Sequence, residues 1–218
     1  MPARVIWIAR HASRLDFADR EWAKRSPRPH DPPLSPAGAS EALALARRLS
    51  RESIDYLFSS PFLRCVETAR PVATHLGLAI KIEPGLSEWL NREWFPSFPD
   101  VLPLAELMRH APEIDASYSP RGEARYGESG EEALLRSGRA ARRLAGEFAG
   151  NLLFVGHGAS VLGAAVGLLG EGSAMGSGEK LPELPYACLI KLMEHGDGWR
   201  LELRGDTAHL REPHHRPD

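Results

Sequence analysis

Six residues of the kinds that phosphoryl transfer uses follow predicted strands of this chain. They are Arg10, His11, Arg14, Arg64, Glu88 and His157. The first three follow the apolar stretch "RVIWIA", and the others come after "YLFSS", within "IKIEPGLSE" and directly after "NLLFVG". In open α/β sheets, ligands bind beyond the carboxyl ends of the strands, so we expect these six side chains to lie along one rim.

The residue types in this set favour transfer of a phosphoryl group. Guanidinium groups bind phosphate oxygens in a bidentate way, and several of them can stabilise the charge of the transition state. A neutral imidazole, oriented through its other nitrogen, can act as the nucleophile on phosphorus, and nearby arginines disfavour its cationic form. Glu88, when protonated, can donate to the departing alkoxide or phenoxide and later activate water. This chemistry needs no metal ion and no cofactor.

The elements that must position these residues alternate between strands and helices. Strands are predicted at 4–9, 54–60, 78–85 and 151–156, and a late hairpin at 186–193 and 199–204. A helix is predicted from Pro36, with Ser35 as N-cap and with Leu43, Ala46 and Leu49 on one face. Three more are predicted: one over 60–77 that opens with Ser-Pro, one over 130–149 with Ser129 as N-cap, and one that begins at Ala159. Pro71 is expected to kink or divide the second helix. The alternation predicts a mostly parallel sheet covered on both faces, a three-layer α/β/α fold with an antiparallel edge.

Five short motifs in this order resemble the histidine phosphatase superfamily, which has the phosphoglycerate mutase-like fold. They are "RHA", "SSPFLRCVETA", "GES", "GHG" and "GDTAHL". "RHASRLDF", Trp22 and "EPGLSEW" are further similar to one branch, the suppressor-of-T-cell-receptor-signalling and ecdysteroid-phosphate phosphatases. The resemblance spans nearly the whole chain and implies a single domain over 1–218.

The resemblance also implies a role for each candidate residue. His11 would be the phosphorylated nucleophile, with Arg10, Arg64 and His157 completing the phosphate pocket. Arg14 matches an additional phosphate-binding arginine of the closer relatives, and Glu88 matches their proton donor. Two residues depart from the usual pattern, which has glycine where Ala12 stands and an acidic residue where Ser13 stands.

The segment at about 89–127 is predicted to be an irregular insertion that acts as a lid or sets substrate specificity. It is rich in prolines and aromatic residues, and its sequence has no clear period. Trp89, Trp94, Phe95 and Phe98 either line a substrate pocket or form a small separate core.

Composition limits the partners and the location. A formal net charge of −2 argues against nucleic acid or an anionic membrane as the main partner. The chain has only two cysteines, its first apolar run is too short for a signal peptide, and no stretch is long enough to span a membrane, so we expect a cytoplasmic protein. The edge hairpin could support a homodimer. We expect a disordered tail, not a metal site, around His209, His214 and His215.

Taken together, these features predict a metal-independent phosphoric monoester hydrolase that works through a phosphohistidine. One alternative is a phosphoglycerate mutase-type transferase, although the segment after "RHAS" lacks the Trp-Asn pair expected there in mutases. Another is a catalytically silent domain that only binds a phosphorylated partner. The natural substrate stays open among phosphotyrosine protein, a phosphorylated steroid-like alcohol and a sugar phosphate.

Overall fold

A mixed six-stranded sheet forms the centre of the computed structural model, which describes residues 4–170 and 184–211. The strands are β1 (Val5–Arg10), β2 (Tyr56–Ser59), β3 (Ile80–Ile82), β4 (Leu152–Gly156), β5 (Leu189–His195) and β6 (Gly198–Asp206). Their order across the sheet is β3-β2-β4-β1-β5-β6. The first four in this order pair in parallel, and β5 and β6 add an antiparallel hairpin at one edge. The predicted sheet type and edge hairpin are confirmed.

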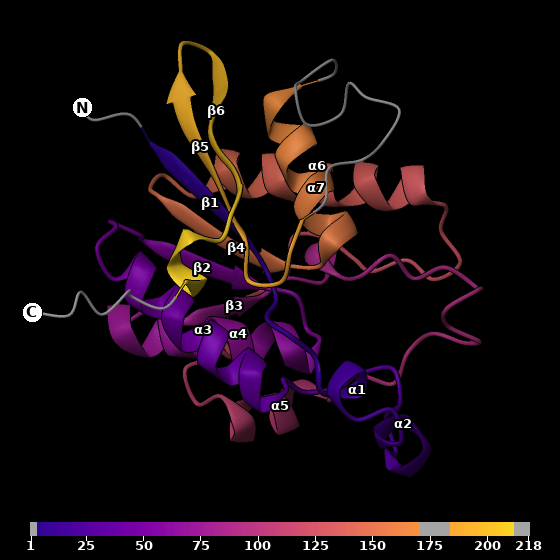
Figure 1. Ribbon diagram of the computed structural model, residues 1–218. Coiled ribbons are helices and arrows are strands. Elements are labelled where there is room, and N and C mark those ends of the chain that lie inside the picture. The colour runs from indigo at the N-terminus through magenta and orange to yellow at the C-terminus, as the bar shows by residue number, and fades with distance from the viewer. Residues whose placement is uncertain (1–3, 171–183, 212–218) are drawn as a thin grey trace, which may run out of the picture.

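Helices cover both faces of the sheet (Figure 1). They are α1 (Leu15–Ala18), α2 (Trp22–Arg25), α3 (Pro36–Leu49), α4 (Leu63–Leu76), α5 (Leu104–His110), α6 (Gly130–Glu147) and α7 (Gly158–Leu169), with short 3₁₀ helices η1 (Pro84–Leu86) and η2 (Ala208–Leu210). Alternation along β1 divides the core, because Trp7 packs in the cluster with α3 and α4 whereas Ile6 and Ile8 pack in the cluster with α6 and α7. The three-layer α/β/α fold predicted from the sequence is therefore confirmed.

The start of α3 is as predicted, but one of its core positions is not. The Ser35 hydroxyl accepts a hydrogen bond from the Gly38 amide (3.0 Å), and Pro36 occupies the first turn. Leu43, predicted to lie on the buried face, is 45% exposed, because Leu45 on the adjacent face fills the core instead. A Cβ atom at Gly38 would lie 2.1 Å from the Ser13 carbonyl oxygen, so α3 can approach the loop after β1 only with glycine there.

The predicted opening of α4 is wrong, and of the two effects predicted for Pro71, a kink or a division, the division is wrong. The helix begins at Leu63, with Phe62 as an N-cap that offers no side-chain hydrogen bond. The cap is supplied from a distant loop, since the Asp31 carboxylate accepts from the Leu63 amide (2.8 Å). The helix runs through Pro71 without a break and ends at Gly77, whose φ of 65° suits a left-handed C-cap.

Two further boundaries complete the comparison with the sequence. Helix α6 has the predicted Ser129 cap as a full capping box but ends at Glu147, two residues before the predicted Ala149. Between η1 and α6, the described helix is the seven-residue α5.

Among the residues that the structure describes, no helix is long and apolar enough to cross a membrane. The predicted disordered tail is wrong for His209, which lies in η2 and is partly buried, whereas His214 and His215 lie outside the described residues.

Candidate active site

A cavity of about 410 Å³ lies beyond the carboxyl ends of the central strands. Its charged lining comes from four of the six predicted residues, namely Arg10, Arg14, Arg64 and Glu88. Its apolar and aromatic lining includes Phe17, His30, Trp94, Phe95 and Tyr186. The two remaining predicted residues, His11 and His157, lie against it, because their donor atoms are within 4.8 Å of each other and of the Glu88 carboxylate.

His11 is held with one ring nitrogen available for chemistry. The residue is 1% exposed, and its Nδ1 lies 2.8 Å from the Ala12 carbonyl oxygen. A carbonyl oxygen can only accept, so Nδ1 carries the proton and Nε2 keeps its lone pair. Burial lowers the pKa of His11 well below the ordinary 6.5, and the positive charge of Arg64 acts in the same direction. The result is a neutral imidazole, as a nucleophile requires.

His157 is oriented by partners on both ring nitrogens. Its Nε2 lies 2.8 Å from the Ser60 hydroxyl, and its Nδ1 lies 3.1 Å from Nη2 of Arg64 and 3.3 Å from Oε2 of Glu88. Its ring stands edge-on to that of His11, with centroids 5.2 Å apart. Burial lowers the pKa of His157, and Arg64 adds to that effect whereas Glu88 opposes it.

Some of the guanidinium N–H groups at the cavity have no hydrogen-bond partner among the described residues. The Arg64 side chain is fully buried, yet its Nε and Nη1 have no hydrogen-bond partner in the described part of the chain, and the same holds for Nε of Arg10. Arg10 is itself fixed, since Nη1 donates to the Leu184 carbonyl oxygen (2.6 Å) and the guanidinium stacks on Tyr186 (4.2 Å to the ring centroid). Buried unsatisfied donors are costly unless a ligand satisfies them, so this arrangement suits an oxyanion.

Arg14 enters the same cavity but shares its charge with an acid. Its Nε and Nη2 donate to the two carboxylate oxygens of Asp16, at 2.9 and 2.5 Å. This bidentate pair holds the guanidinium plane in place and leaves Nη1 free of the Asp16 contact. Arg14 therefore contributes less net positive charge to the cavity than Arg64 does.

Glu88 lies at the cavity wall between the second histidine and the buried arginine. Its Oε2 is 3.3 Å from Nδ1 of His157 and 3.5 Å from Nη2 of Arg64, and Oε1 accepts from the Trp89 amide (3.0 Å). Burial by itself raises the pKa of Glu88, but interactions with His157 and Arg64 outweigh it and lower the pKa below its usual range. Glu88 is therefore ionised in the free site and must gain a proton before it can act as an acid.

The cluster of His11, Glu88 and His157 also has the spacing of a metal site. Arg64 contacts both Glu88 and His157, so a divalent cation bound there would face a buried guanidinium. The same guanidinium attracts an anion. The charge distribution thus fits an oxyanion better than a metal ion.

The loop after β1 accommodates the two unusual residues, Ala12 and Ser13. The Ala12 amide donates to the Thr68 hydroxyl (3.0 Å). The amide and the hydroxyl of Ser13 both donate to the Glu41 carboxylate, at 2.8 Å each. Glu41 on α3 and Thr68 on α4 therefore fix the loop that carries His11.

Sequence reasoning missed several residues that support or line the site. They are Asp31, Glu41, Ser60, Thr68, His30, Phe17 and Tyr186. Ser60 stands inside the motif "SSPFLRC" and could be found there, but the Ser-Pro pattern predicts a helix start at this residue, not a contact with His157. Thr68 and Phe17 likewise stand inside the motifs "SSPFLRCVETA" and "RHASRLDF". The others have no local signal, since each acts through a contact that only the fold creates.

The aromatic residues of the 89–127 segment divide into two groups. Trp94 and Phe95 line the cavity, and Phe95 also stacks against His30 with ring centroids 5.3 Å apart. Trp89 and Phe98 are not part of this lining. The Trp89 indole nitrogen donates to the Glu128 carbonyl oxygen (2.9 Å), and the Phe98 ring lies edge-on to that of Tyr126 with centroids 6.5 Å apart. Two of the four aromatics thus face the cavity, and two do not belong to its lining.

Comparisons of the sequence agree with this geometry. A family model described as the histidine phosphatase superfamily (branch 1) matches residues 6–207. An ecdysteroid-phosphate phosphatase of Drosophila melanogaster is 28% identical over 91% of this chain and 31% of its own length. The human ubiquitin-associated and SH3 domain-containing protein A is 36% identical over 42% of this chain and 15% of its own length. This chain spans a third or less of the length of these relatives.

Solved structures show the same fold. The ecdysone phosphate phosphatase of Bombyx mori, determined in complex with tungstate, superposes with a TM-score of 0.79 at 23% identity, covering 99% of this chain and 98% of that one. A mycobacterial glucosyl-3-phosphoglycerate phosphatase superposes with a TM-score of 0.65 at 23% identity, covering 94% of this chain and all of that one. The phosphoglycerate mutase-like α/β fold implied by the sequence motifs is confirmed.

Proposed function

The chain belongs to branch 1 of the histidine phosphatase superfamily, and from that premise we propose that it is a metal-independent phosphomonoesterase. His11 is the proposed nucleophile and Glu88 the proton donor, with His157 beside them. Arg10, Arg14 and Arg64 are the proposed phosphate-binding residues. One observation carries the proposal: two edge-to-face imidazoles stand beside buried guanidinium donors that have no partner in the described part of the chain.

The proposed reaction has two displacements at phosphorus. In the first, Nε2 of His11 forms a bond to phosphorus, the bond from phosphorus to the leaving oxygen breaks, and Glu88 gives that oxygen a proton. In the second, a water oxygen bonds to phosphorus, the phosphorus–nitrogen bond breaks, and Glu88 takes up the proton of the water. The products are an alcohol and inorganic phosphate.

Substrate binding favours uptake of a solvent proton by Glu88, which gives the protonated Glu88 that this reaction needs. A phosphate dianion beside Glu88 disfavours the ionised carboxylate and raises its pKa, and it also draws the Arg64 donors towards itself. The arginines then hold the equatorial oxygens, on which charge is spread in the transition state.

The test is hydrolysis of p-nitrophenyl phosphate by the wild type and by His11→Ala, with and without a chelator. We expect release of p-nitrophenol by the wild type in both conditions, and loss of that activity in the variant. Brief incubation with labelled substrate should give a phosphoenzyme that is stable in base and labile in acid, as a phosphoramidate is. Equal rates for wild type and variant would remove His11 from the mechanism. Binding without turnover would favour a silent binder, and phosphoglycerate isomerisation faster than phosphate release would favour a mutase.

We propose that the preferred leaving group is bulky and apolar or aromatic. Phe17, Trp94, Phe95 and Tyr186 surround the cavity, and the names of two relatives refer to ecdysteroid phosphate and ecdysone phosphate. The 89–127 segment, which supplies Trp94 and Phe95, is the proposed specificity insertion of a single domain. A panel of steroid, aryl, peptide and sugar phosphates ranked by kcat/KM would test this preference.

Three further parts of the proposal concern the surroundings of the protein. Both cysteines are unpaired and buried, which is typical of a reducing compartment such as the cytoplasm. The edge strand β6 offers unpaired backbone groups through which a second copy could bind and form a homodimer. The formal net charge of −2 argues against nucleic acid or an anionic membrane as the main partner. Cell fractionation and light scattering would test the first two points.

A further inference from the structure

Arg136 of α6 reaches from outside the cavity to the backbone that carries Glu88. Its side chain is 7% exposed. Nη1 donates to the carbonyl oxygen of Gly85 (2.8 Å), and Nη2 donates to those of Ser87 (3.2 Å) and Glu88 (2.9 Å). A single guanidinium thus holds three carbonyl groups of the turn that ends at Glu88.

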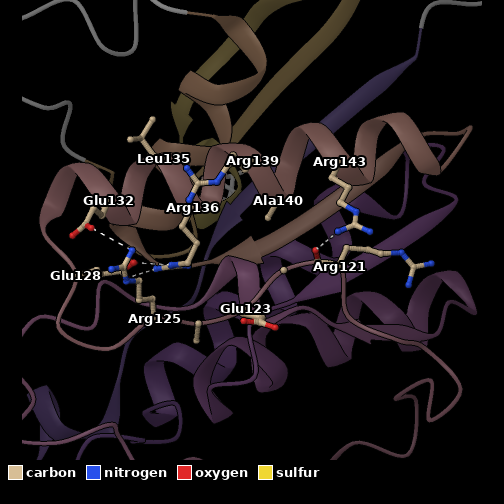
Figure 2. A pocket seen from close by; sticks show the side chains of 12 residues that line it. Arg121, Glu123, Arg125, Glu128, Glu132, Leu135, Arg136, Arg139, Ala140 and Arg143 are labelled. Carbon is tan, nitrogen blue, oxygen red and sulfur yellow. Dashed lines mark hydrogen bonds and ion pairs between the residues drawn. The ribbon is translucent and has the colours of Figure 1, made fainter.

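Glu128 completes this arrangement from the other side of the turn. Its carboxylate accepts from Nε and Nη2 of Arg136, at 3.0 and 2.6 Å, in a bidentate pair (Figure 2). One of its carboxylate oxygens also accepts from the Leu90 amide (3.4 Å), and its main-chain oxygen accepts from the Trp89 indole (2.9 Å). The two residues therefore hold the chain on both sides of Glu88.

The cost of this pair points to a role beyond general stability. Glu128 has a fully buried side chain, and Arg136 is nearly buried. A buried ion pair loses the hydration of both charges, so it is often no more stabilising than apolar residues of the same size. What the pair does provide is a fixed direction for several backbone groups at once, which apolar packing does not provide.

We propose that Arg136 and Glu128 are positioning residues that aim the Glu88 carboxyl group at the leaving oxygen. This inference rests on the proposed role of Glu88 as proton donor. Neither residue lines the cavity of His11, and neither touches the reacting atoms. They act by fixing the backbone of Glu88, whose own side chain contacts Arg64 and His157.

A second cavity, of about 760 Å³, opens on the other side of Arg136 and offers the means to test this role (Figure 2). Arg139, one turn along α6, lines the same cavity and is exposed, and it has no ion pair among the described residues. Arg139→Ala therefore removes the same side-chain type from the same helix and cavity without touching the Glu88 turn. The cavity also leaves a route by which a small cation from solvent can reach the space of a truncated Arg136.

The experiment compares kcat/KM for glycerol phosphate, phenyl phosphate and 2,4-dinitrophenyl phosphate. A positioned general acid contributes about 10²–10⁴-fold, and only where the leaving group needs a proton. We expect Arg136→Ala to lose on the order of 10–100-fold on glycerol phosphate and less than about threefold on the dinitrophenyl ester. Arg139→Ala should stay within about twofold on all three, as is usual for an exposed residue away from the site. Millimolar guanidinium chloride should restore part of the activity of Arg136→Ala and leave Arg139→Ala unchanged.

A double variant separates positioning from general structure. If Arg136 acts through Glu88, adding Arg136→Ala to Glu88→Gln should cause no further loss on glycerol phosphate. Arg136→Lys keeps the charge but not the fork and is measured in the same way, so that unfolding of the alanine variant would leave a variant to assay. Equal losses on all three esters, or full additivity in the double variant, would overturn the inference.

The proposed function can fail separately. If the wild type hydrolyses none of the three esters, the phosphatase proposal is overturned, and the positioning role falls with it. If the wild type is active and Glu88→Gln shows the leaving-group dependence, but Arg136→Ala and Arg136→Lys do not, only the positioning role is overturned.

Discussion

The base of the cavity and its rim are built in opposite ways. The base consists of His11, Arg64 and His157, which are at most 1% exposed and which lie just after β1, in the first turn of α4 and at the N-cap of α7. The rim includes Phe17 and Trp94, which are 53% and 56% exposed and lie in a four-residue helix and in a turn region. The base is held by the fold, whereas the rim is held mainly by local contacts.

This difference separates the residues of the proposed reaction from the residues that select the substrate. In the proposed reaction, the groups that must be aligned with one phosphoryl group lie on rigid elements, where many contacts determine each position. Groups that meet variable leaving groups lie on loops, where sequence changes cost little stability. We therefore expect changes at the base to affect all monoesters and changes at the rim to affect some.

The largest effect is expected for Arg64→Lys at the base. Lysine keeps the positive charge but cannot present the two buried donors, Nε and Nη1, that have no protein partner in the described chain. Loss of one preorganised donor to a developing anion costs about 10²–10³-fold in rate. We expect a loss of this size in kcat/KM on every monoester of a panel. A loss confined to bulky substrates would show that the base also selects, and would contradict the division.

The next effect concerns the contact between α3 and the loop after β1. In Gly38→Ala, the new Cβ would lie 2.1 Å from the Ser13 carbonyl oxygen, so the helix or the loop that carries His11 must move. Overpacking of this kind costs about 1–3 kcal/mol in the free energy of unfolding, or more. We expect both a lower midpoint in urea unfolding and a uniform fall in kcat/KM.

Gly146→Ala is the matched control for this change. A Cβ at Gly146 has no neighbour within 4 Å, and the residue lies in the last turn of α6. Alanine is favoured over glycine in a helix by up to about 1 kcal/mol, so this variant should be no less stable than the wild type. If Gly38→Ala matched it in both assays, the base would be less rigid than the geometry implies.

The sequence predicted the base much better than its supports. "RHA" and "GHG" each put a histidine at a strand end, and parallel strands bring such ends together, so His11 and His157 could be placed by local pattern alone. Asp31 caps α4 from 32 residues upstream, and Glu41 holds Ser13 from 28 residues downstream. No period or motif encodes such contacts, because they depend on how separate elements pack.

For the rim, the sequence predicted the type of residue but not which residues face the cavity. Composition showed that residues 89–127 are aromatic and irregular, but not which aromatics face the cavity. Trp89 and Trp94 lie edge-to-face with ring centroids 5.1 Å apart, yet of the two only Trp94 lines the cavity. A turn region has no repeat that assigns alternate residues to alternate sides, so its inward face is decided by the final packing.

The pH dependence of kcat/KM tests whether His11, at the base of the cavity, is held in its neutral form. The lowered pKa of His11 keeps its imidazole neutral below the ordinary 6.5, so kcat/KM should hold through pH 6.5 and fall only at more acidic pH. Arg10 is one of the positive charges that lower this pKa, so Arg10→Gln should move the acidic fall to higher pH. Arg64→Lys keeps its charge and should leave the position of that fall unchanged. A half-maximal rate at pH 6.5 in the wild type would contradict the burial argument.

The smallest effect is expected at the rim, for Trp94→Ala. Loss of this half-exposed side chain should lower kcat/KM by about tenfold on aryl and steroid phosphates, since burial of part of an indole contributes 1–2 kcal/mol, and by less than about twofold on glycerol phosphate. Phe98→Ala is the matched control, because Phe98 is 51% exposed in the same segment but does not line the cavity. Equal losses on small and bulky esters would mean that Trp94 supports the base, and that the boundary between the two regions lies further out than the exposure of the side chains indicates.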